Sequence, residues 1–338
     1  ILGLGKVWYK GEVINTEDLP LDICPPAIKL KSKEGLSLIN GTQFSLAYSV
    51  WSVYHAEKIM RWANVIASLS IEAYNCSLDP FDLDLHLIRQ HSGQQKVAQE
   101  ILDLLEGSDI LKQPKSSIQD PYSFRCIPQV HGASLHALEH VASTIQNEVN
   151  AVTDNPNVFP DQNKILLGGN FHAQPLALVL DYLCIALSEI SNISERRIYK
   201  LVEGERGLPD YLTSHSGLNS GMMIAQYTAA SIVSQNKQLC SPCSVDSIVS
   251  SKGQEDHVSM AANGATRTFR VVENVYKVLA IELMVAAQAI EFRRPLKSSR
   301  TLDRVFSAYR KIIPKLEKDR ILSTDLNKTI AFIKSKNY

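Results

Sequence analysis

The feature that most constrains the fold is a long segment with few helix breakers, which runs from Thr42 to about Asn75. The Asn40-Gly41 pair ends the preceding segment, and Thr42 is suited to cap the N-terminus of a helix. At a rise of about 1.5 Å per residue such a helix is near 50 Å long. A compact small domain needs no helix of this length, so the chain is expected to build a long-helix bundle.

Further helices are predicted at about 84–106, 121–151, 172–203, 217–239 and 259–292. The end of the last one, LMVAAQAI (283–290), is apolar on nearly every side. A helix that is apolar all round is buried, either in the centre of a bundle or between subunits. The predicted fold is therefore mainly α, with long and roughly parallel helices in an oligomer.

Three regions are expected along the chain. Residues 1–37 form a short segment that is rich in turns and has the alternating character of β-strands. An irregular, β-leaning segment with short strands is therefore predicted there. Residues 38–295 are predicted to form the central helical bundle with the active-site loops. Residues 296–338 are expected to form C-terminal helices.

Composition and charge exclude several classes of partner. The chain has 338 residues, of which 45% are hydrophobic and 21% charged, and Lys+Arg and Asp+Glu both number 35. This balance gives no reason to expect nucleic acid or an anionic membrane as a partner. Residues 211–236 lack charge but contain many polar side chains, so no membrane span is predicted. Six irregularly spaced cysteines without a signal peptide indicate reduced thiols in a cytoplasmic protein.

The stretch QDPYSFRC (119–126) places an amide, a phenol and a guanidinium at three-residue intervals. Asp120-Pro121 predicts a helix start, with Asp120 as the N-cap and Pro121 in the first helical position. Tyr122 and Arg125 then lie one turn apart on the same face, and Gln119 lies in the entry loop. Because a guanidinium fork matches both oxygens of a carboxylate, Arg125 is a candidate carboxylate ligand. The alternative is an ordinary surface helix start.

Three more stretches place polar or aromatic groups just before the N-terminus of a predicted helix. KEGLSLINGTQ (33–43) ends in Asn40-Gly41, and LLGGNFHAQP (166–175) presents Phe171 and His172 after a Gly-Gly pair. SSKGQEDHVSM (250–260) sets four polar groups ahead of a very apolar helix, and one carboxylate there is expected to face a site. The alternatives are plain turns and helix capping.

Two patterns in the sequence are similar to metal sites. His136, Glu139 and His140 match the H-x-x-E-H pattern of inverted zinc proteases, and the two histidines share one helix face. However, no distal glutamate ligand in a second helix is identifiable. Cys240 and Cys243 form a lone C-x-x-C pair without a second pair at zinc-ribbon spacing. No metal is therefore expected, and zinc hydrolysis through His136, Glu139 and His140 is kept as an alternative.

Taken together and in this order, these stretches and NEVNAVTDNP (147–156) resemble the aromatic amino-acid ammonia-lyase family. The resemblance runs over essentially the whole chain, from LGKVWYKGE to the apolar helix before Arg293. It implies a mainly α fold of the ammonia-lyase/fumarase-like type and a homotetramer whose active sites are assembled from several subunits. It also implies elimination of ammonia from an L-amino acid without an external cofactor. The family uses an electrophilic methylidene-imidazolone ring, which forms autocatalytically from an internal Ala-Ser-Gly.

The resemblance also implies roles for individual residues. Arg125 would bind the substrate carboxylate, and Tyr122 would line the site beside the electrophile and the amino group. Gln119 and Asn40 would form hydrogen bonds near the electrophile and the carboxylate, and Phe171 would pack against the electrophile ring.

Substrate choice is expected to depend on Gln254 and Glu255. Members of the family that act on histidine resemble this Gln-Glu-Asp pattern. A carboxylate at Glu255 suits an imidazole, which donates a hydrogen bond, better than a phenyl ring, which does not. The expected reaction converts L-histidine to trans-urocanate, the first step of histidine degradation. An ammonia-lyase or aminomutase that acts on tyrosine or phenylalanine is the alternative within the family.

One part of the family pattern is missing, since the chain contains no Ala-Ser-Gly. In the family this tripeptide lies shortly before the segment that resembles Ile1-Leu2-Gly3. The native protein is therefore expected to be longer at its N-terminus, and this chain is expected to carry about half of the site. A non-catalytic paralogue without the tripeptide is a third alternative.

Overall fold

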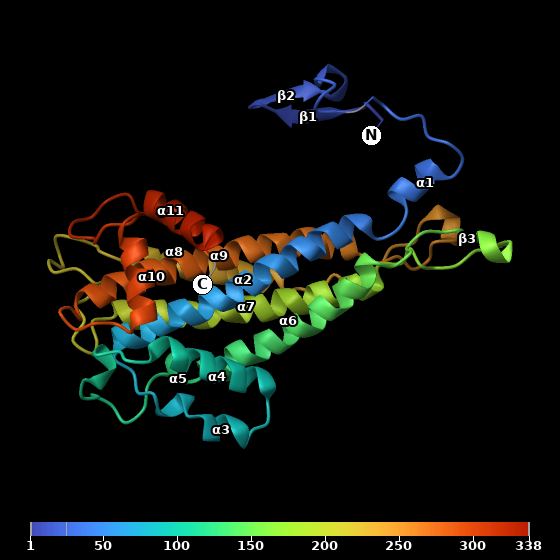
Figure 1. Ribbon diagram of the computed structural model, residues 1–338. Helices are drawn as coiled ribbons and strands as arrows, with labels where there is room; N and C mark the ends of the chain where they lie inside the picture. The colour runs from blue at the N-terminus through green and yellow to red at the C-terminus, as the bar shows by residue number, and fades with distance from the viewer. Residues whose placement is uncertain (1, 25, 337–338) are drawn as a thin grey trace. The chain divides into compact units, whose positions relative to one another are not determined.

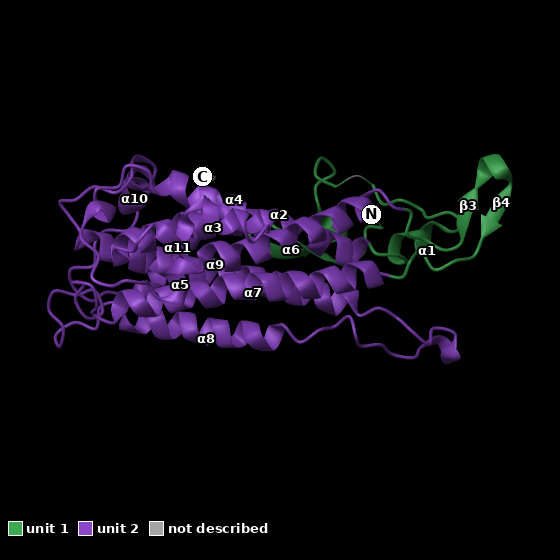
Figure 2. Cartoon of the chain, turned by 90° about the horizontal axis from the view of Figure 1, so that it is seen from below, with its two compact units in different colours: residues 1–42, 152–172 green, residues 43–151, 173–338 purple. Residues whose placement is uncertain are grey.

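The computed structural model describes residues 2–24 and 26–336 and divides the chain into two compact units (Figure 2). Unit 1 contains residues 1–42 and 152–172, and unit 2 contains residues 43–151 and 173–338. The region boundaries expected from the sequence, at residues 37/38 and 295/296, stay predictions.

The described part of unit 1 contains two antiparallel hairpins and one short α-helix. Strand β1 (Lys6–Tyr9) pairs with β2 (Glu12–Asn15), and β3 (Asn157–Phe159) pairs with β4 (Lys164–Leu166). The first hairpin turns at Lys10-Gly11, where φ is 49° and 93°. Two-residue hairpin loops favour positive φ because it matches the twist of the paired strands. Helix α1 (Glu34–Ile39) follows, and this unit confirms the β-leaning texture predicted for the start of the chain.

Unit 2 is a bundle of long helices (Figure 1). Its longest members run alongside one another and are α2 (Gln43–Tyr74), α6 (Ile127–Val149), α7 (Gln174–Val202) and α9 (Ala261–Glu291). Helix α2 has 32 residues and directly follows Thr42, so the predicted long helix is confirmed. Helix α9 packs against both α2 and α7 and forms the centre of the bundle.

The predicted all-round burial of residues 283–290 is also confirmed. All eight residues are buried, and they are buried within this one chain rather than at a free surface. Their one polar member, Gln288, donates from Nε2 to the carbonyl oxygens of Leu212 and Leu316 and accepts from the Leu316 amide. Because its amide nitrogen and oxygen both have hydrogen-bond partners, Gln288 can be buried in the apolar core without an unsatisfied polar group.

Shorter helices complete unit 2: α3 (Leu83–Leu87), α4 (Ser92–Leu105), α5 (Tyr122–Arg125), α8 (Met223–Leu239), α10 (Arg300–Arg310) and α11 (Leu322–Ser335). The predicted continuous helix at 84–106 is wrong, because Gln90 adopts φ 65° and the chain restarts at Ser92. Helix α8 begins only at Met223, because residues 217–222 form turns with positive φ at Gly217 and Gly221.

Among residues 2–24 and 26–336, one helix is long and apolar enough to cross a membrane. This is helix α7, and 67% of its most apolar stretch is buried inside unit 2. Core helices of globular proteins meet the same criteria, so the finding is weak support for a membrane span.

Helices α4 and α6 approach closely at two glycines. A Cβ atom built on Gly132 would lie 2.5 Å from the Gln94 nitrogen, and one built on Gly93 would lie 2.4 Å from the Gly132 oxygen. Replacing Gly132 by alanine is expected to lower the free energy of unfolding by about 1–3 kcal/mol, because the helices must move apart. Thermal or denaturant unfolding measures this effect.

Gly264 in α9 provides the matched control, because the nearest heavy atom to its built Cβ lies at 3.9 Å. Gly264→Ala is expected to retain or raise stability, by up to about 1 kcal/mol, since alanine favours the helix. Equal stability of the two variants would show that the α4–α6 crossing is not limited by backbone contact.

Candidate active site

The short helix α5 carries Tyr122 and Arg125, and buried polar groups hold its start. Asp120 is buried and accepts hydrogen bonds from the Ser77 amide at 2.7 Å and from Nη1 of Arg206 at 2.7 Å. The prediction that Asp120 caps the helix is wrong, since Pro121 occupies the cap position and no side chain caps it. The carboxylate instead fixes the entry loop against other elements of unit 2.

A second buried group holds the body of α5. Arg197 of α7 forms a two-pronged ion pair with Glu282 of α9, at 2.6 Å from Nε and 2.9 Å from Nη2, and both side chains are fully buried. The remaining Nη1 of Arg197 donates to the Ser123 carbonyl at 3.2 Å. Phe124 stacks on the ring of Tyr74, with centroids 4.6 Å apart. Helix α5 is therefore a rigid platform.

On this platform Tyr122 and Arg125 lie on the same face, as predicted. The Arg125 guanidinium carbon is 4.6 Å from the centre of the Tyr122 ring. Nε of Arg125 is buried and has no hydrogen-bond partner among the described residues. Among all the residues that the structure describes, no carboxylate forms an ion pair with Arg125. Tyr122 is 71% exposed, and Gln119 is exposed in the loop before it. The geometry presents a cation and a phenol to a ligand.

Gln254 and Glu255 lie on a separate projection of unit 2. Residues 243–259 join α8 to α9, and we call them the arm. Its tip turns through a short 3₁₀ helix (Ser251–Gly253) with positive φ, and the Ser250 and Glu255 backbones pair across it at 2.8 and 3.4 Å. Gln254 and Glu255 are both exposed at this tip.

Within one copy of unit 2, Arg125 and Glu255 are not brought together. Arg197 of α7 touches α5, whereas Asp181 of the same helix touches the base of the arm. These two positions are sixteen residues apart on one helix, a separation of about 24 Å. The arm tip points further away, beyond the end of the bundle (Figure 2). A single amino acid cannot contact both groups in one copy.

Asn40 and Phe171, the remaining candidates, belong to unit 1. The side chain of Asn40 donates from Nδ2 to Asp154 at 3.3 Å. Asp154 also forms an ion pair with Lys33 and accepts from the Ser37 hydroxyl at 2.8 Å. The Lys33 ammonium, followed by the Ser37 hydroxyl, holds the pKa of the Asp154 carboxyl well below its usual range. This ionised carboxylate orients the Asn40 amide.

Phe171 is 37% exposed and shortly precedes helix α7. Its ring is presented at the surface of unit 1, as the Gly-Gly pair before it predicts.

Several residues that position the site were missed at the sequence level. They are Asp154 beside Asn40, Arg197 and Glu282 behind α5, and Arg206 beside Asp120. Asp154 lies in the NAVTDNP stretch (150–156), which carries the family resemblance but does not by itself indicate a contact with Asn40. The signal for Glu282 is a charged side chain within a largely apolar helical segment, because such charges are buried only when paired. Arg197 lies in the charged run ERRIYK (195–200), so its burial has no such signal.

The alternative zinc site gains no support. Glu139 pairs with Lys96 at 2.7 Å on the surface, and the His140 ring faces Tyr182 at 6.3 Å. Across residues 2–24 and 26–336 no three His, Cys, Asp or Glu side chains gather to hold a metal ion. In the C-x-x-C pair, the Cys240 thiol contacts the Ser188 hydroxyl, with Sγ 2.9 Å from the hydroxyl oxygen.

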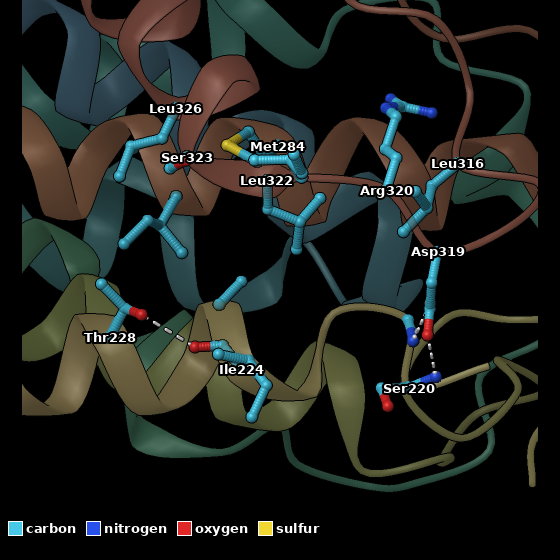
Figure 3. Close-up of a pocket in the computed structure, with 14 residues that line it drawn as sticks. Ser220, Ile224, Thr228, Met284, Leu316, Asp319, Arg320, Leu322, Ser323 and Leu326 are labelled. Atoms are coloured by element: carbon cyan, nitrogen blue, oxygen red, sulfur yellow. Dashed lines mark hydrogen bonds between the residues drawn. The ribbon is translucent and has the colours of Figure 1, made fainter.

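A cavity of about 480 Å³ lies elsewhere in unit 2, between α8, α9 and the segment that leads into α11 (Figure 3). Its walls are mainly apolar, including Ile224, Met284 and Leu322. Its acid, Asp319, already accepts from the Ser220 and Gly221 amides at 2.7 and 2.9 Å. The candidate residues do not line this cavity.

Comparisons with known proteins confirm the resemblance to this family. Residues 1–311 match the family described as "Aromatic amino acid lyase". The chain is 46% identical over 337 residues to histidine ammonia-lyase of Caldanaerobacter subterraneus subsp. tengcongensis, covering 99% of this chain and 66% of that protein. It therefore spans slightly less than two thirds of that relative's length.

Two solved structures share the fold. The crystal structure of histidine ammonia-lyase from Trypanosoma cruzi aligns with a TM-score of 0.92 and 42% identity, over 99% of this chain and 64% of that one. Phenylalanine aminomutase of Pantoea agglomerans aligns with a TM-score of 0.90 and 29% identity, over 97% and 68%. These matches confirm the predicted mainly α fold.

Proposed function

Because this chain belongs to the aromatic amino acid lyase family, we propose that its protein eliminates ammonia from L-histidine to give trans-urocanate, the first step of histidine degradation. In this reaction the C–N bond at Cα and a C–H bond at Cβ break and a C=C bond forms. The observation that carries the proposal is the Arg125 guanidinium, which has no carboxylate partner in the described chain and lies beside Tyr122 on a rigid helix.

The residues of this chain bind and orient the substrate. The fork of Arg125 holds both oxygens of the amino-acid carboxylate. With one end clamped, Cα and its amino group are held beside the Tyr122 phenol, which lowers the entropy cost of the reaction. The amides of Gln119 and Asn40 donate hydrogen bonds near the carboxylate. Phe171 supplies an apolar face.

The methylidene-imidazolone ring of this family makes the amino group a better leaving group when it is present. The phenol of Tyr122 and the unpartnered Nε of Arg125, both on α5, fit a site that holds an anionic substrate beside such a ring. A full-length gene product whose intact mass is lower than the encoded mass by two water molecules, one from ring closure and one from dehydration of the serine, would support this. An unmodified mass with no product formed would favour the paralogue alternative.

The choice of histidine depends on Glu255. Its carboxylate accepts a hydrogen bond from an imidazole N–H, whereas a phenyl ring leaves it without a partner. The fold similarity to phenylalanine aminomutase favours, as the second candidate, a lyase or aminomutase that acts on phenylalanine or tyrosine.

Glu255→Ala in the full-length protein is expected to lower kcat/KM for L-histidine by roughly 100-fold or more, because the imidazole loses its acceptor. Turnover of L-tyrosine and L-phenylalanine is expected to fall less or to rise. The measurement is ultraviolet detection of each product, with Glu106→Ala, an exposed glutamate that directly follows α4, as the control. Parallel losses for all three substrates would contradict the role of Glu255.

The separation of Arg125 and Glu255 supports an active site that is completed by other subunits of a homotetramer. On α7 three large apolar side chains, Leu178, Tyr182 and Ile185, are 54%, 46% and 49% exposed. Their spacing places them on one helix face, as expected for a surface that packs against another helix. All six cysteines are free thiols, which supports a cytoplasmic location.

A further inference from the structure

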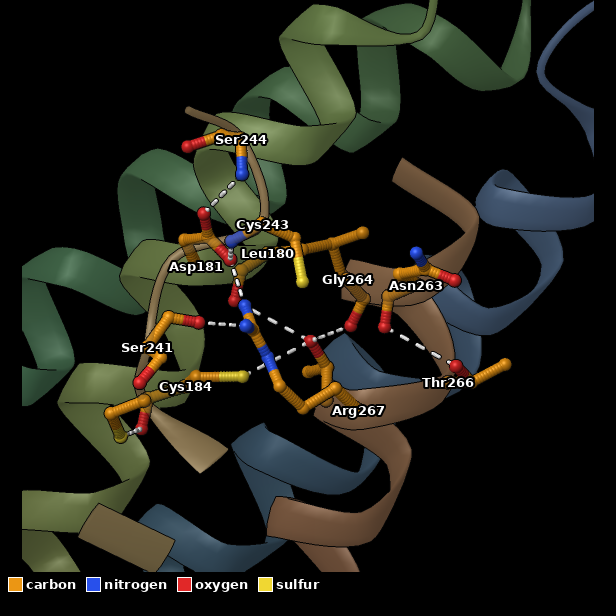
Figure 4. A network of polar contacts seen from close by, with 12 residues as sticks. Leu180, Asp181, Cys184, Ser241, Cys243, Ser244, Asn263, Gly264, Thr266 and Arg267 are labelled. Atoms are coloured by element: carbon orange, nitrogen blue, oxygen red, sulfur yellow. Dashed lines mark hydrogen bonds and ion pairs between the residues drawn. The ribbon is translucent and has the colours of Figure 1, made fainter. Parts of the chain in front are cut away.

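We propose that Asp181 and Arg267 are positioning residues, which fix the arm so that Glu255 meets the substrate side chain. This rests on the proposed function. The two residues lie on α7 and α9 at the base of the arm, within a network of polar contacts (Figure 4). Neither residue was a candidate at the sequence level.

Asp181 holds the backbone where the arm begins. Its Oδ2 accepts from the Ser244 amide at 2.8 Å, and its Oδ1 accepts from the Cys243 amide at 3.2 Å. The Asp181 side chain is only 7% exposed and also forms an ion pair with Arg267. Charge-assisted hydrogen bonds of this kind are stronger than neutral ones, so the base of the arm has one preferred orientation.

Arg267 connects three helices at the same point. Nη2 pairs with Asp181 of α7, and Nη1 donates to the carbonyl of Ser241, just beyond the end of α8. Arg267 itself lies on α9, which follows the arm. The first residue of α7, Gln174, adds a hydrogen bond from Nε2 to the Ser244 carbonyl at 2.8 Å. The entry of the arm is thus tied to one ion pair, and the same ion pair joins α7 to α9, the helix that follows the arm.

The arm transmits this orientation to its tip. Ser247 donates to the Val258 carbonyl at 3.0 Å and accepts from the Val258 amide at 2.9 Å, which closes the middle of the arm. The Ser250–Glu255 backbone pair closes the tip. Because hydrogen bonds join its two segments and its base is held in place, the arm is expected to move as one rigid body. A small rotation at Asp181 therefore displaces Glu255, and a misplacement of about 1 Å can cost 100-fold in rate.

The test uses the full-length protein with Arg267→Met and Asp181→Asn. Both variants are expected to raise KM for L-histidine more than they lower kcat, with a loss of roughly 10-fold or more in kcat/KM. The preference for histidine over tyrosine is expected to shrink, because Glu255 is no longer held in place. Hydrogen exchange in a peptide that covers 245–258 is expected to become faster.

Arg310→Met is the matched control, because Arg310 pairs with Glu291 at 2.8 Å with similar burial, at the opposite end of α9. It is expected to leave KM, the histidine preference and arm exchange unchanged. Arg267→Lys keeps the charge opposite Asp181 but loses the fork. It is expected to fold even if Arg267→Met does not, and to show a smaller shift in the same direction.

The outcomes separate the two proposals. If the unmodified protein forms no urocanate, the proposed function fails. If it forms urocanate and Arg267→Lys and Asp181→Asn match Arg310→Met in KM, preference and arm exchange, the positioning role is overturned. A loss of active protein at unchanged KM and unchanged preference also overturns it, since that result shows a purely structural role.

Discussion

Replacing Arg125 by methionine in the full-length protein is expected to lower kcat/KM for L-histidine by about 100-fold or more, equivalent to roughly 3 kcal/mol of transition-state binding. The substrate carboxylate then loses the guanidinium that would hold both of its oxygens. Because the carboxylate is bound in the ground state and in the transition state, much of the loss is expected in KM. Initial rates over a range of histidine concentrations measure it.

Two comparisons sharpen this result. Arg125→Lys is expected to recover part of the loss, since an ammonium supplies charge without the planar fork. Arg304→Met removes an exposed arginine from α10 and is expected to match the unmodified protein. An Arg125→Met protein with unchanged KM and kcat would remove the observation on which the proposed function rests.

Replacing Glu282 by alanine is expected to lower the free energy of unfolding by about 3–5 kcal/mol, because it leaves the buried Arg197 guanidinium without a carboxylate. Both side chains are fully buried, and Glu282 also accepts a hydrogen bond from Ser70 at 2.7 Å. Denaturant unfolding followed by circular dichroism measures the change.

Two further variants test the cause of that loss. The double variant Arg197→Met with Glu282→Leu is expected to lose less than Glu282→Ala, since no charge remains buried. Glu139→Ala breaks the exposed pair with Lys96 and is expected to cost less than about 1 kcal/mol. A Glu282→Ala protein as stable as Glu139→Ala would mean that water reaches the Arg197 site.

Elements whose cause is local were predictable from the sequence. Helix α2 and the buried end of α9 follow from apolar periodicity and the lack of breakers, and both are confirmed. The shared face of Tyr122 and Arg125 follows from their spacing of three residues. The seven candidate site residues and their roles stay predictions, although the structure shows how Asn40 and Arg125 are held.

Elements that depend on distant partners were not predictable. Asp120 has the local sequence signature of a helix cap. Its carboxylate instead binds the Ser77 amide and Arg206, which lies 86 residues further along the chain. The partners Arg197 and Glu282 are 85 residues apart, so the pair is visible only once α7 and α9 are packed together. The break at Gln90 depends on a positive φ, and glutamine is not a residue type that indicates such a conformation in a sequence.

The most direct test of the proposed ammonia-lyase activity is ultraviolet detection of product from the full-length gene product, given L-histidine and L-tyrosine separately with a chelator present. We expect trans-urocanate from histidine at a rate that the chelator does not change, and little coumarate from tyrosine. Coumarate as the main product would keep the family and overturn the role of Glu255. No product from either substrate, from a protein of unmodified mass, would contradict the proposed ammonia-lyase activity.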